Sequence, residues 1–292
     1  MSMAALARET ITVSKLHPYI GAEVTGADLR RPLDEMSFEI IREAWSRHSV
    51  LVLRDQRIDD DQQVEFARRF GTLEETTFTV AADNPYIYKL SNVDEEGNVL
   101  PVRSRKRLFL DVNARWHTDS SFRPIPAMGS ILSGRKVPAR EHGDTAFASM
   151  RVGWETLPEE KKRALEGLVA VHDYSYSVGL FGDRLIPKSE MDSVPPVRHP
   201  LVRTHPPTGL GSLFVSGHVE RIEGMPVEEG RALVAELIEW CTRPEYVYRH
   251  RWRQYDLVMW DNRCTLHRAT AIPATEPRLM HRATVAGEGP VV

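Results

Sequence analysis

The chain has 292 residues, of which 41% are hydrophobic and 27% charged, and its formal net charge is −3. This composition is ordinary for a globular protein, and a weakly acidic chain whose arginines cluster only locally gives no reason to expect a nucleic-acid partner. No run of about 18 apolar residues occurs, and the first residues lack an apolar signal core, so we expect neither a membrane span nor a signal peptide.

The two cysteines, Cys241 and Cys264, form neither a disulfide framework nor a C-x-x-C pair. A reducing compartment suits such a chain, and we therefore expect the protein in the cytoplasm. Its length allows one large domain or two small ones. The composition sets no number of subunits, so a homo-oligomer stays compatible with it.

The first quarter of the chain predicts short strands and two helices. Residues 11–29 have the pattern of short strands interrupted by proline and glycine, and the apolar run 49–54 predicts a buried strand. Ser37 is a suitable N-cap for a helix of about three turns. The second helix begins at three aspartates, 59–61, which favour the positive end of a helix dipole, and it ends near Gly71.

The middle of the chain alternates predicted strands with polar segments. Residues 86–90 predict a strand. The polar run 91–113, with four basic residues, predicts a loop, and in an enzyme such a loop can also be a mobile lid. Residues 116–122, 130–133 and 144–147 then predict three more strands.

The last part of the chain returns to strands after two helical segments. A helix with Pro158 in its first turn is expected, and a second one opens at Pro226. Between them, residues 174–198 are rich in proline, glycine and aspartate, which indicates an excursion from the sheet. Further strands are predicted at 213–216, 246–248, 257–260 and 282–286. Strands without βαβ alternation favour a double-sheet antiparallel barrel with helices packed outside it.

The stretch around His117 and Asp119 is the strongest candidate for chemistry. On a strand, residues two apart share a face, so both side chains could hold one metal ion. His267 could supply a third ligand from far along the chain. Two histidines and one carboxylate leave one side of the ion open, which suits non-haem Fe(II) and oxygen. The spacing alone fits equally a histidine beside a solvated aspartate.

Two late arginines, Arg278 and Arg282, are four residues apart. On a strand they would share a face and point into the same barrel. A buried arginine needs an anion, and its guanidinium group binds carboxylates with two hydrogen bonds. The pair would then suit two acidic small molecules, although two surface arginines give the same pattern.

Five blocks of the sequence carry a resemblance to a known family. They are 116–124, 143–145, 201–206, 260–268 and 282–284. In this order they resemble the taurine/2,4-dichlorophenoxyacetate dioxygenase family of Fe(II)/2-oxoglutarate enzymes, over almost the whole chain. The resemblance implies a mainly β fold with α insertions: a double-stranded β-helix (jelly-roll, cupin-like) core with flanking helices. It implies a single domain, 1–292, in which 91–113 and 174–198 are insertion or lid candidates.

The resemblance also implies roles for individual residues. His117, Asp119 and His267 would hold Fe(II), and they form the catalytic centre. Thr145 and Arg278 would hold the distal carboxylate of the co-substrate 2-oxoglutarate, whose keto-acid end chelates the metal. The remaining metal position is left for O2.

Other positions are implied to surround the substrate. Arg282 would face its acidic group, and Asn113 and His218 match positions near its pocket. Trp260 matches an aromatic residue beside the metal, although a plain core tryptophan fits as well. His205 belongs to a motif that occurs whatever the substrate, so we interpret it as structural.

The implied activity is hydroxylation of a small anionic substrate, with 2-oxoglutarate converted to succinate and CO2. The stretches 119–126 and 256–267 are most similar to the branch that cleaves aryloxyalkanoates such as 2,4-dichlorophenoxyacetate to a phenol and a glyoxylate-type product. A sulfonate, an alkyl sulfate or a biosynthetic carboxylic acid could face Arg282 equally well. A non-catalytic barrel that binds a carboxylate and a structural metal is the alternative from another class.

The sequence departs from that branch at the pocket mouth. Thr79 and Asn98 stand where lysines are usual, which puts a chlorinated phenoxyacetate in doubt as the substrate. Arg103, Arg105 or Lys106 could substitute for them.

Overall fold

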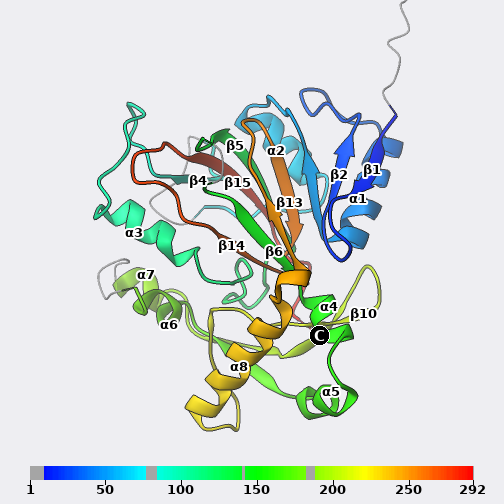
Figure 1. Cartoon of the computed structure of the whole chain (residues 1–292), viewed down its shortest axis with the longest axis vertical. Coiled ribbons are helices and arrows are strands. Elements are labelled where there is room, and N and C mark those ends of the chain that lie inside the picture. Colours follow the sequence, from blue (N-terminus) through cyan, green and yellow to red (C-terminus); the bar gives the residue numbers. More distant parts are fainter. Residues whose placement is uncertain (1–9, 77–83, 140–141, 182–187, 292) are drawn as a thin grey trace, which may run out of the picture.

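The computed structural model describes residues 10–76, 84–139, 142–181 and 188–291, and within them the chain is mainly β with helices outside the sheets (Figure 1). The largest sheet has seven strands, in the order β1 (Thr12–Lys15), β2 (Ala22–Thr25), β3 (Val50–Leu53), β13 (Leu257–Asp261), β5 (Gly129–Lys136), β15 (Leu279–Val285) and β4 (Ile87–Ser91). A second sheet has the order β12 (Val247–His250), β6 (Thr145–Ser149) and β14 (Thr265–Ala269). Neighbouring strands in these sheets are antiparallel, apart from β2 and β3.

The two sheets enclose an apolar core that is built from alternate residues of their strands. Val52 and Val258 of the large sheet point into it, as does Trp260, and they meet Phe147 of β6. The ring centroids of Phe147 and Trp260 are 5.5 Å apart. Because successive strand residues point to opposite faces, this core uses only half of each strand. The arrangement is the double-sheet, jelly-roll core that the sequence predicted.

The outer face of the large sheet is covered by helices. Leu51 and Met259, neighbours of the inward residues, pack against α1 (Glu35–His48) and α2 (Asp60–Arg68), where Phe66 is among the buried side chains. Burial on both faces explains why β3 is an uninterrupted apolar run in the sequence.

The remaining elements lie outside the two main sheets (Figure 1). Two small sheets have the orders β11 (Val219–Ile222), β7 (Val169–His172), β8 (Val197–Pro200) and β10 (Leu210–Leu213), β9 (Val202–His205). The helices are α3 (Arg105–Val112), α4 (Met150–Glu155), α5 (Glu159–Leu165), α6 (Tyr174–Gly179), α7 (Lys188–Asp192), α8 (Val227–Cys241) and the 3-10 helix Pro244–Tyr246. Helices α4, α5 and α8 share a second apolar cluster with β6 and β14.

Several predicted elements need correction. The segment 91–113 is not a plain loop, because it contains α3. The apolar run 213–216 is mostly buried core chain outside a strand, since β10 ends at Leu213. The N-cap of α1 is Asp34 and not Ser37, since its carboxylate accepts the Ser37 backbone N–H at 3.0 Å. The predicted strand 116–122 is also wrong, and its true form is described with the site.

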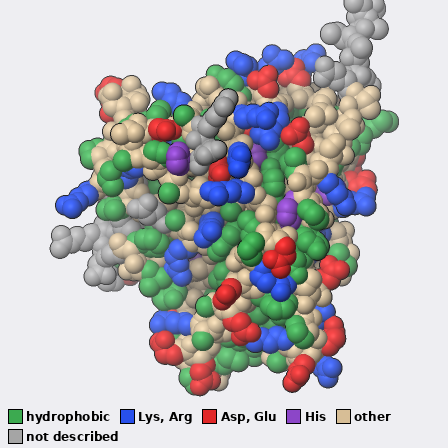
Figure 2. All heavy atoms as spheres, in the orientation of Figure 1, with side chains coloured by type: hydrophobic (Ala, Val, Ile, Leu, Met, Phe, Trp, Pro, Cys, Tyr) green, Lys and Arg blue, Asp and Glu red, His purple; other side chains and the backbone are tan. Residues whose placement is uncertain are grey.

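Acidic and basic side chains are both present on the face shown in Figure 2. Within the described part of the chain, no helix is both long enough and apolar enough to cross a membrane.

Candidate active site

Three side chains from two distant parts of the chain meet between the sheets. His117 and His267 are paired by reciprocal backbone hydrogen bonds of 3.0 and 2.8 Å, and their ring centroids are 4.2 Å apart. The Asp119 carboxylate lies beside them, with Oδ1 3.9 Å from Nε2 of His117 and Oδ2 3.7 Å from Nε2 of His267. The three ligand atoms lie within 4.8 Å of one another. One ion could contact all three.

His117 and Asp119 face this point without forming a strand. Only His117 pairs with β14, and the chain then turns, with Ser120 in the left-handed region at a φ of 55°. Asn262 stabilises this turn with two hydrogen bonds. Its side-chain Oδ1 accepts the Asp119 backbone N–H at 3.3 Å, and its backbone carbonyl accepts the Thr118 hydroxyl at 2.8 Å. The prediction of a shared direction is therefore confirmed, although the predicted strand is wrong.

The protonation states suit metal binding, which needs neutral imidazoles and an ionised carboxylate. Burial lowers the pKa of both His117 and His267. Nδ1 of His117 lies 2.8 Å from the carbonyl oxygen of Arg115, which can only accept, so Nδ1 carries the proton and Nε2 presents a lone pair. Burial alone would raise the pKa of Asp119, but the Arg282 guanidinium lowers it below its usual range.

Each oxygen of the Asp119 carboxylate has its own partner. Oδ2 accepts the Ser130 hydroxyl at 2.7 Å, and Oδ1 accepts NH1 of Arg282, also at 2.7 Å. Ser130 in turn accepts Nδ2 of Asn262 at 3.0 Å, while Oδ1 of Asn262 accepts Nε1 of Trp260 at 2.9 Å. This chain of hydrogen bonds fixes the carboxylate from behind. No sequence pattern marks Ser130, and none indicates the role of Asn262, although Asn262 lies in one of the family blocks.

A first cavity of about 100 Å³ opens beside His267 and is lined by Thr145, Trp260, Arg278 and others. Arg278 is 5% exposed, and among the described residues no carboxylate pairs with it. Burial lowers its pKa to about 10, so the group stays cationic at neutral pH. The Thr145 hydroxyl accepts Nε1 of Trp252 at 3.0 Å and can still donate. An unpaired buried cation beside a hydroxyl donor is suited to a carboxylate ligand.

A second cavity, of about 110 Å³, lies on the other side of His117 and Asp119. Its charged wall includes Arg282, which also reaches the first cavity. Its lining also includes four aromatic rings, those of Tyr86, Tyr88, Phe122 and Tyr174, which form its aromatic wall. The two cavities therefore meet at the candidate metal ligands.

Both predicted pocket residues line the second cavity. The His218 ring packs edge-on against His117, with centroids 5.9 Å apart, and its Nδ1 bonds the Ser177 hydroxyl at 2.8 Å. Burial lowers the pKa of His218 to about 3, so its imidazole is neutral. Asn113 lines both cavities, just beyond the end of α3. Trp260 is both a core residue and a neighbour of the site, because its ring lies 4.7 Å from that of His267.

Of the residues predicted at the pocket mouth, those that the structure describes line neither cavity. Asn98 lies in a turn, where its amide bonds Asp94, and it lines neither cavity. Arg103 is exposed and likewise outside both linings. Thr79 and the side chains of Arg105 and Lys106 lie outside the described residues. The neighbouring Arg107 does line the first cavity, and its NH1 donates to the Ala274 carbonyl at 2.9 Å.

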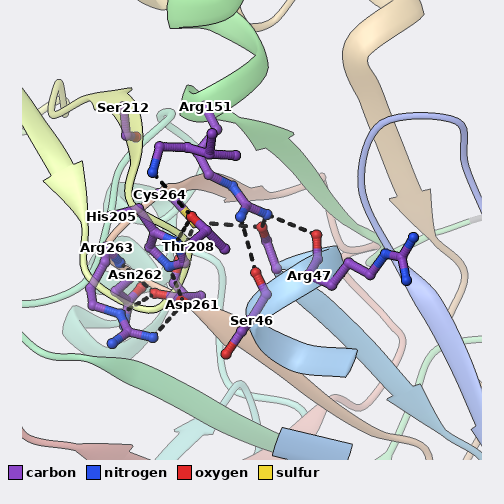
Figure 3. Close-up of polar contacts among 12 residues, drawn as sticks. Ser46, Arg47, Arg151, His205, Thr208, Ser212, Asp261, Asn262, Arg263 and Cys264 are labelled. Atoms are coloured by element: carbon purple, nitrogen blue, oxygen red, sulfur yellow. Dashed lines mark hydrogen bonds and ion pairs between the residues drawn. The ribbon is translucent and has the colours of Figure 1, made fainter. Parts of the chain in front are cut away.

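A second buried group of metal-capable side chains consists of His205, Asp261 and Cys264 (Figure 3). Its polar atoms already have protein partners. Both Asp261 oxygens accept from the Arg263 guanidinium, at 2.8 and 2.7 Å, and Oδ2 also lies 2.9 Å from Nε2 of His205. Burial alone would lower the pKa of His205, but the hydrogen bond with Asp261 raises it to about 9. A protonated imidazole has no lone pair for a metal, and the interpretation of His205 as structural fits this network.

Known proteins are similar to this chain in sequence. The family model described as "Taurine catabolism dioxygenase TauD, TfdA family" matches residues 12–284. The chain is 40% identical, over 95% of each chain, to an alpha-ketoglutarate-dependent 2,4-dichlorophenoxyacetate dioxygenase from Burkholderia sp. (strain RASC). It is 35% identical, over 94% of this chain and 95% of the relative, to an (S)-phenoxypropionate/alpha-ketoglutarate-dioxygenase from Sphingobium herbicidovorans.

The fold has a near match among solved structures. A crystal structure of AAD-2 in complex with Mn(II) and N-oxalylglycine superposes with a TM-score of 0.89 and 42% sequence identity, covering 97% of this chain and 99% of that one. At this identity and coverage, the agreement extends across the barrel and its surrounding elements.

Proposed function

Because the chain belongs to the TauD, TfdA family, it is an Fe(II)- and 2-oxoglutarate-dependent dioxygenase, and we propose that its substrate is an aryloxyalkanoate. The observation that carries this proposal is the second cavity, which joins an arginine to an aromatic wall beside the candidate metal ligands. Such a cavity suits a molecule with a carboxylate at one end and an aromatic ring at the other.

We assign Fe(II) to His117, Asp119 and His267. Two neutral imidazoles and one carboxylate on one side of an ion are the donor set of non-haem iron oxygenases. The convergence of their ligand atoms within 4.8 Å supports the assignment. When bound, the iron with 2-oxoglutarate and O2 supplies the oxidant that hydroxylates a carbon, with succinate and CO2 as co-products. The protein holds and shields these groups.

We assign the distal carboxylate of 2-oxoglutarate to Arg278 and Thr145. The assignment is supported by the buried guanidinium of Arg278 in the first cavity. No carboxylate of the described residues pairs with it, so a dianion there would neutralise its charge. The Thr145 hydroxyl would donate to the same carboxylate. The hydroxyl and guanidinium donors then set the direction of the ligand relative to His267.

We assign the substrate carboxylate to Arg282 and its ring to the aromatic wall. Asn113 and His218 would border the reacting carbon, because both line this cavity and the His218 ring contacts the rings of both Phe122 and His117. Hydroxylation of the carbon that bears the ether oxygen gives a hemiacetal. This product collapses to a phenol and, from an aryloxyacetate, to glyoxylate.

We further propose that α3 is part of a lid. Its residues Arg107 and Leu110 line the first cavity, and Val112 lines the second. A helix in contact with both cavities could exclude water once both acids are bound. For location, two buried free cysteines favour the reducing cytoplasm.

The test is a substrate panel read out by succinate and by product. Phenoxyacetate, 2-phenoxypropionate, taurine and an alkyl sulfate would be compared with Fe(II), 2-oxoglutarate and O2. We expect phenol release in step with succinate from the aryloxyalkanoates. Sulfite or sulfate release without phenol would instead establish the sulfonate or sulfate ester alternative, because a sulfonate can also pair with Arg282.

The aromatic wall offers a matched pair of variants. Phe122→Leu keeps an apolar side chain but removes a ring that packs on Tyr174 and His218, with centroids 4.6 and 5.0 Å away. We expect a higher KM for phenoxyacetate and an unchanged KM for 2-oxoglutarate. Leu180→Ala, at an exposed position, is the control. Equal kinetics of Phe122→Leu and wild type would argue against an aromatic substrate.

A further inference from the structure

We propose that Arg282 couples substrate binding to metal binding, because the same guanidinium holds the metal-binding carboxylate and faces the substrate cavity. An anion on Arg282 would tighten the hold of His117, Asp119 and His267 on the metal, and the metal would tighten the hold on the anion. The inference deepens the proposed function and rests on its assignment of the metal and of the substrate acid.

The guanidinium group of Arg282 contacts Asp119 with only one of its edges. Its NH1 donates to Oδ1 of Asp119 at 2.7 Å. Its Nε is buried and has no hydrogen-bond partner among the described residues, and its guanidinium lies 5.2 Å from the ring centroid of Tyr88 in the aromatic wall. A guanidinium group has five N–H donors, so one edge can bind Asp119 while another receives a carboxylate.

The charge of Arg282 acts on all three candidate ligands. Its NH1 lies 2.7 Å from Oδ1 of Asp119, and the two oxygens of that carboxylate lie 3.9 and 3.7 Å from Nε2 of His117 and of His267. A positive charge this close to the three ligand atoms repels a divalent cation placed between them. An anion bound to Arg282 would cancel that field, so the metal should bind more tightly afterwards.

The other charged groups of this cavity do not cancel Arg282 beforehand. Glu74 and the exposed Glu75 also line this cavity, and Glu74 has partners of its own. Its Oε2 is already occupied by the Ser120 hydroxyl at 3.0 Å and lies 3.9 Å from Nε of Arg123. Glu74 and Arg123 thus offset each other, and Arg282 remains the cation that an incoming anion meets.

A comparison of Ser130 with Arg282 separates the effect of charge on metal affinity from the effect of orienting the Asp119 carboxylate. It bonds the other oxygen of the same carboxylate, at 2.7 Å, and it carries no charge. Losing the Ser130 hydroxyl removes only an orienting contact, whereas losing the Arg282 guanidinium removes an orienting contact and an opposing charge. The two changes should therefore shift metal affinity in opposite directions.

The first test uses Mn(II) alone and no substrate, by calorimetry on metal-free protein whose fold is checked by circular dichroism. We expect Arg282→Met to bind Mn(II) several-fold more tightly than wild type. Ser130→Ala should bind it roughly 10- to 100-fold more weakly, as is typical when a partner of a metal ligand is lost. Unchanged or weaker binding by folded Arg282→Met overturns the proposal.

The second test needs no variant, so it decides the proposal even if Arg282→Met does not fold. Phenoxyacetate affinity is measured on wild-type protein with and without saturating Mn(II), and Mn(II) affinity with and without phenoxyacetate. Reciprocal linkage requires the same factor in both, and we expect roughly 5- to 100-fold. A factor of one overturns the coupling.

The outcomes separate the two proposals. If phenoxyacetate does not bind the Mn(II) protein at all, the assignment of an aryloxyalkanoate fails, while the Mn(II) affinities of Arg282→Met and Ser130→Ala still decide the role of Arg282. If the coupling factor persists unchanged in folded Arg282→Met, the anion acts directly on the metal, and the proposal fails.

Discussion

Two buried clusters in this protein contain the same kinds of side chain and differ in what their atoms can still bind. His117, Asp119 and His267 lie between two cavities, with neutral imidazoles directed at a shared point. His205 and Asp261, next to Cys264, lie in closed protein, where their polar atoms have protein partners (Figure 3). The difference shows that residue type and burial do not identify a metal site. The protonation state and the free lone pairs do.

The pKa shifts make the same distinction in electrostatic terms. In the first cluster burial lowers the pKa of the histidines, and a neighbouring cation helps to keep Asp119 ionised. In the second cluster Asp261 raises the pKa of His205 and keeps it protonated, so the pair is an internal salt bridge. The first cluster can therefore bind a ligand. The second cluster, in which Asp261 pairs with His205 and Arg263, is a structural ion-pair network and is called the brace. The brace lies next to Asn262, which holds the turn of Asp119.

Replacing the aspartate of each cluster in turn should give the largest difference between the two clusters. Asp119→Ala should lose Mn(II) binding and all substrate-dependent succinate formation. It should also cost less stability than Asp261→Ala, because it leaves one cation, Arg282, without its anion, and not two. The measurements are calorimetry with Mn(II), a succinate assay, and urea denaturation of the metal-free protein. Turnover retained by Asp119→Ala would remove the first cluster from the mechanism.

Asp261→Ala should have the opposite signature. It leaves the buried Arg263 guanidinium and the His205 imidazolium without their anion, which costs about 3–5 kcal/mol of unfolding free energy for a broken buried pair. The folded fraction at low temperature should still bind Mn(II). A fully stable Asp261→Ala protein that has lost Mn(II) would mean that the second cluster is the metal site.

Arg278→Met tests the readiness of the first cavity for an anion. Loss of charged hydrogen bonds worth about 1.5–3 kcal/mol should raise the KM for 2-oxoglutarate roughly 10- to 150-fold. The same change should stabilise the protein without 2-oxoglutarate, because an unpaired buried cation disappears. Arg251→Met, at an exposed position outside both cavities, is the control. An unchanged KM in Arg278→Met would contradict the assignment.

The most gradual effect concerns the pH dependence of the ion pair between His205 and Asp261. His205 has a pKa of about 9 in the folded protein and an ordinary one when unfolded, so its contribution is complete below about pH 6.5. As the pH rises through 9, this contribution is lost, at up to about 1.4 kcal/mol per pH unit. Urea denaturation of metal-free wild type and His205→Gln between pH 6 and 10 measures it. A stability difference that grows with pH would have the wrong sign.

Much of the barrel could be predicted from the sequence because its strands are short apolar runs. Helix α3 was missed since its basic first turn, Arg105 to Arg107, resembles a solvated charge run. The strand predicted around His117 was wrong because one left-handed residue, Ser120, redirects the chain, and no pattern marks that position.

The candidate metal ligands could be predicted from the sequence, whereas the residues that orient them could not. The spacing of His117 and Asp119, with the family blocks, was enough to name the third ligand, His267, 148 residues from Asp119 along the sequence. Spacing alone could not do so, because a single bridge between distant segments brings them together. The role of Ser130 could not be predicted, since the hydrogen-bond partner of a serine in a buried strand depends on how the folded sheets pack.

The location of Mn(II) in a crystal grown with 2-oxoglutarate, determined by anomalous scattering, would show which of the two clusters holds the metal. We expect one strong peak bonded to Nε2 of His117, Nε2 of His267 and a carboxylate oxygen of Asp119, with the co-substrate reaching Arg278. A peak at His205, Asp261 and Cys264, or none between His117 and His267, would contradict the assignment of the first cluster as the metal site.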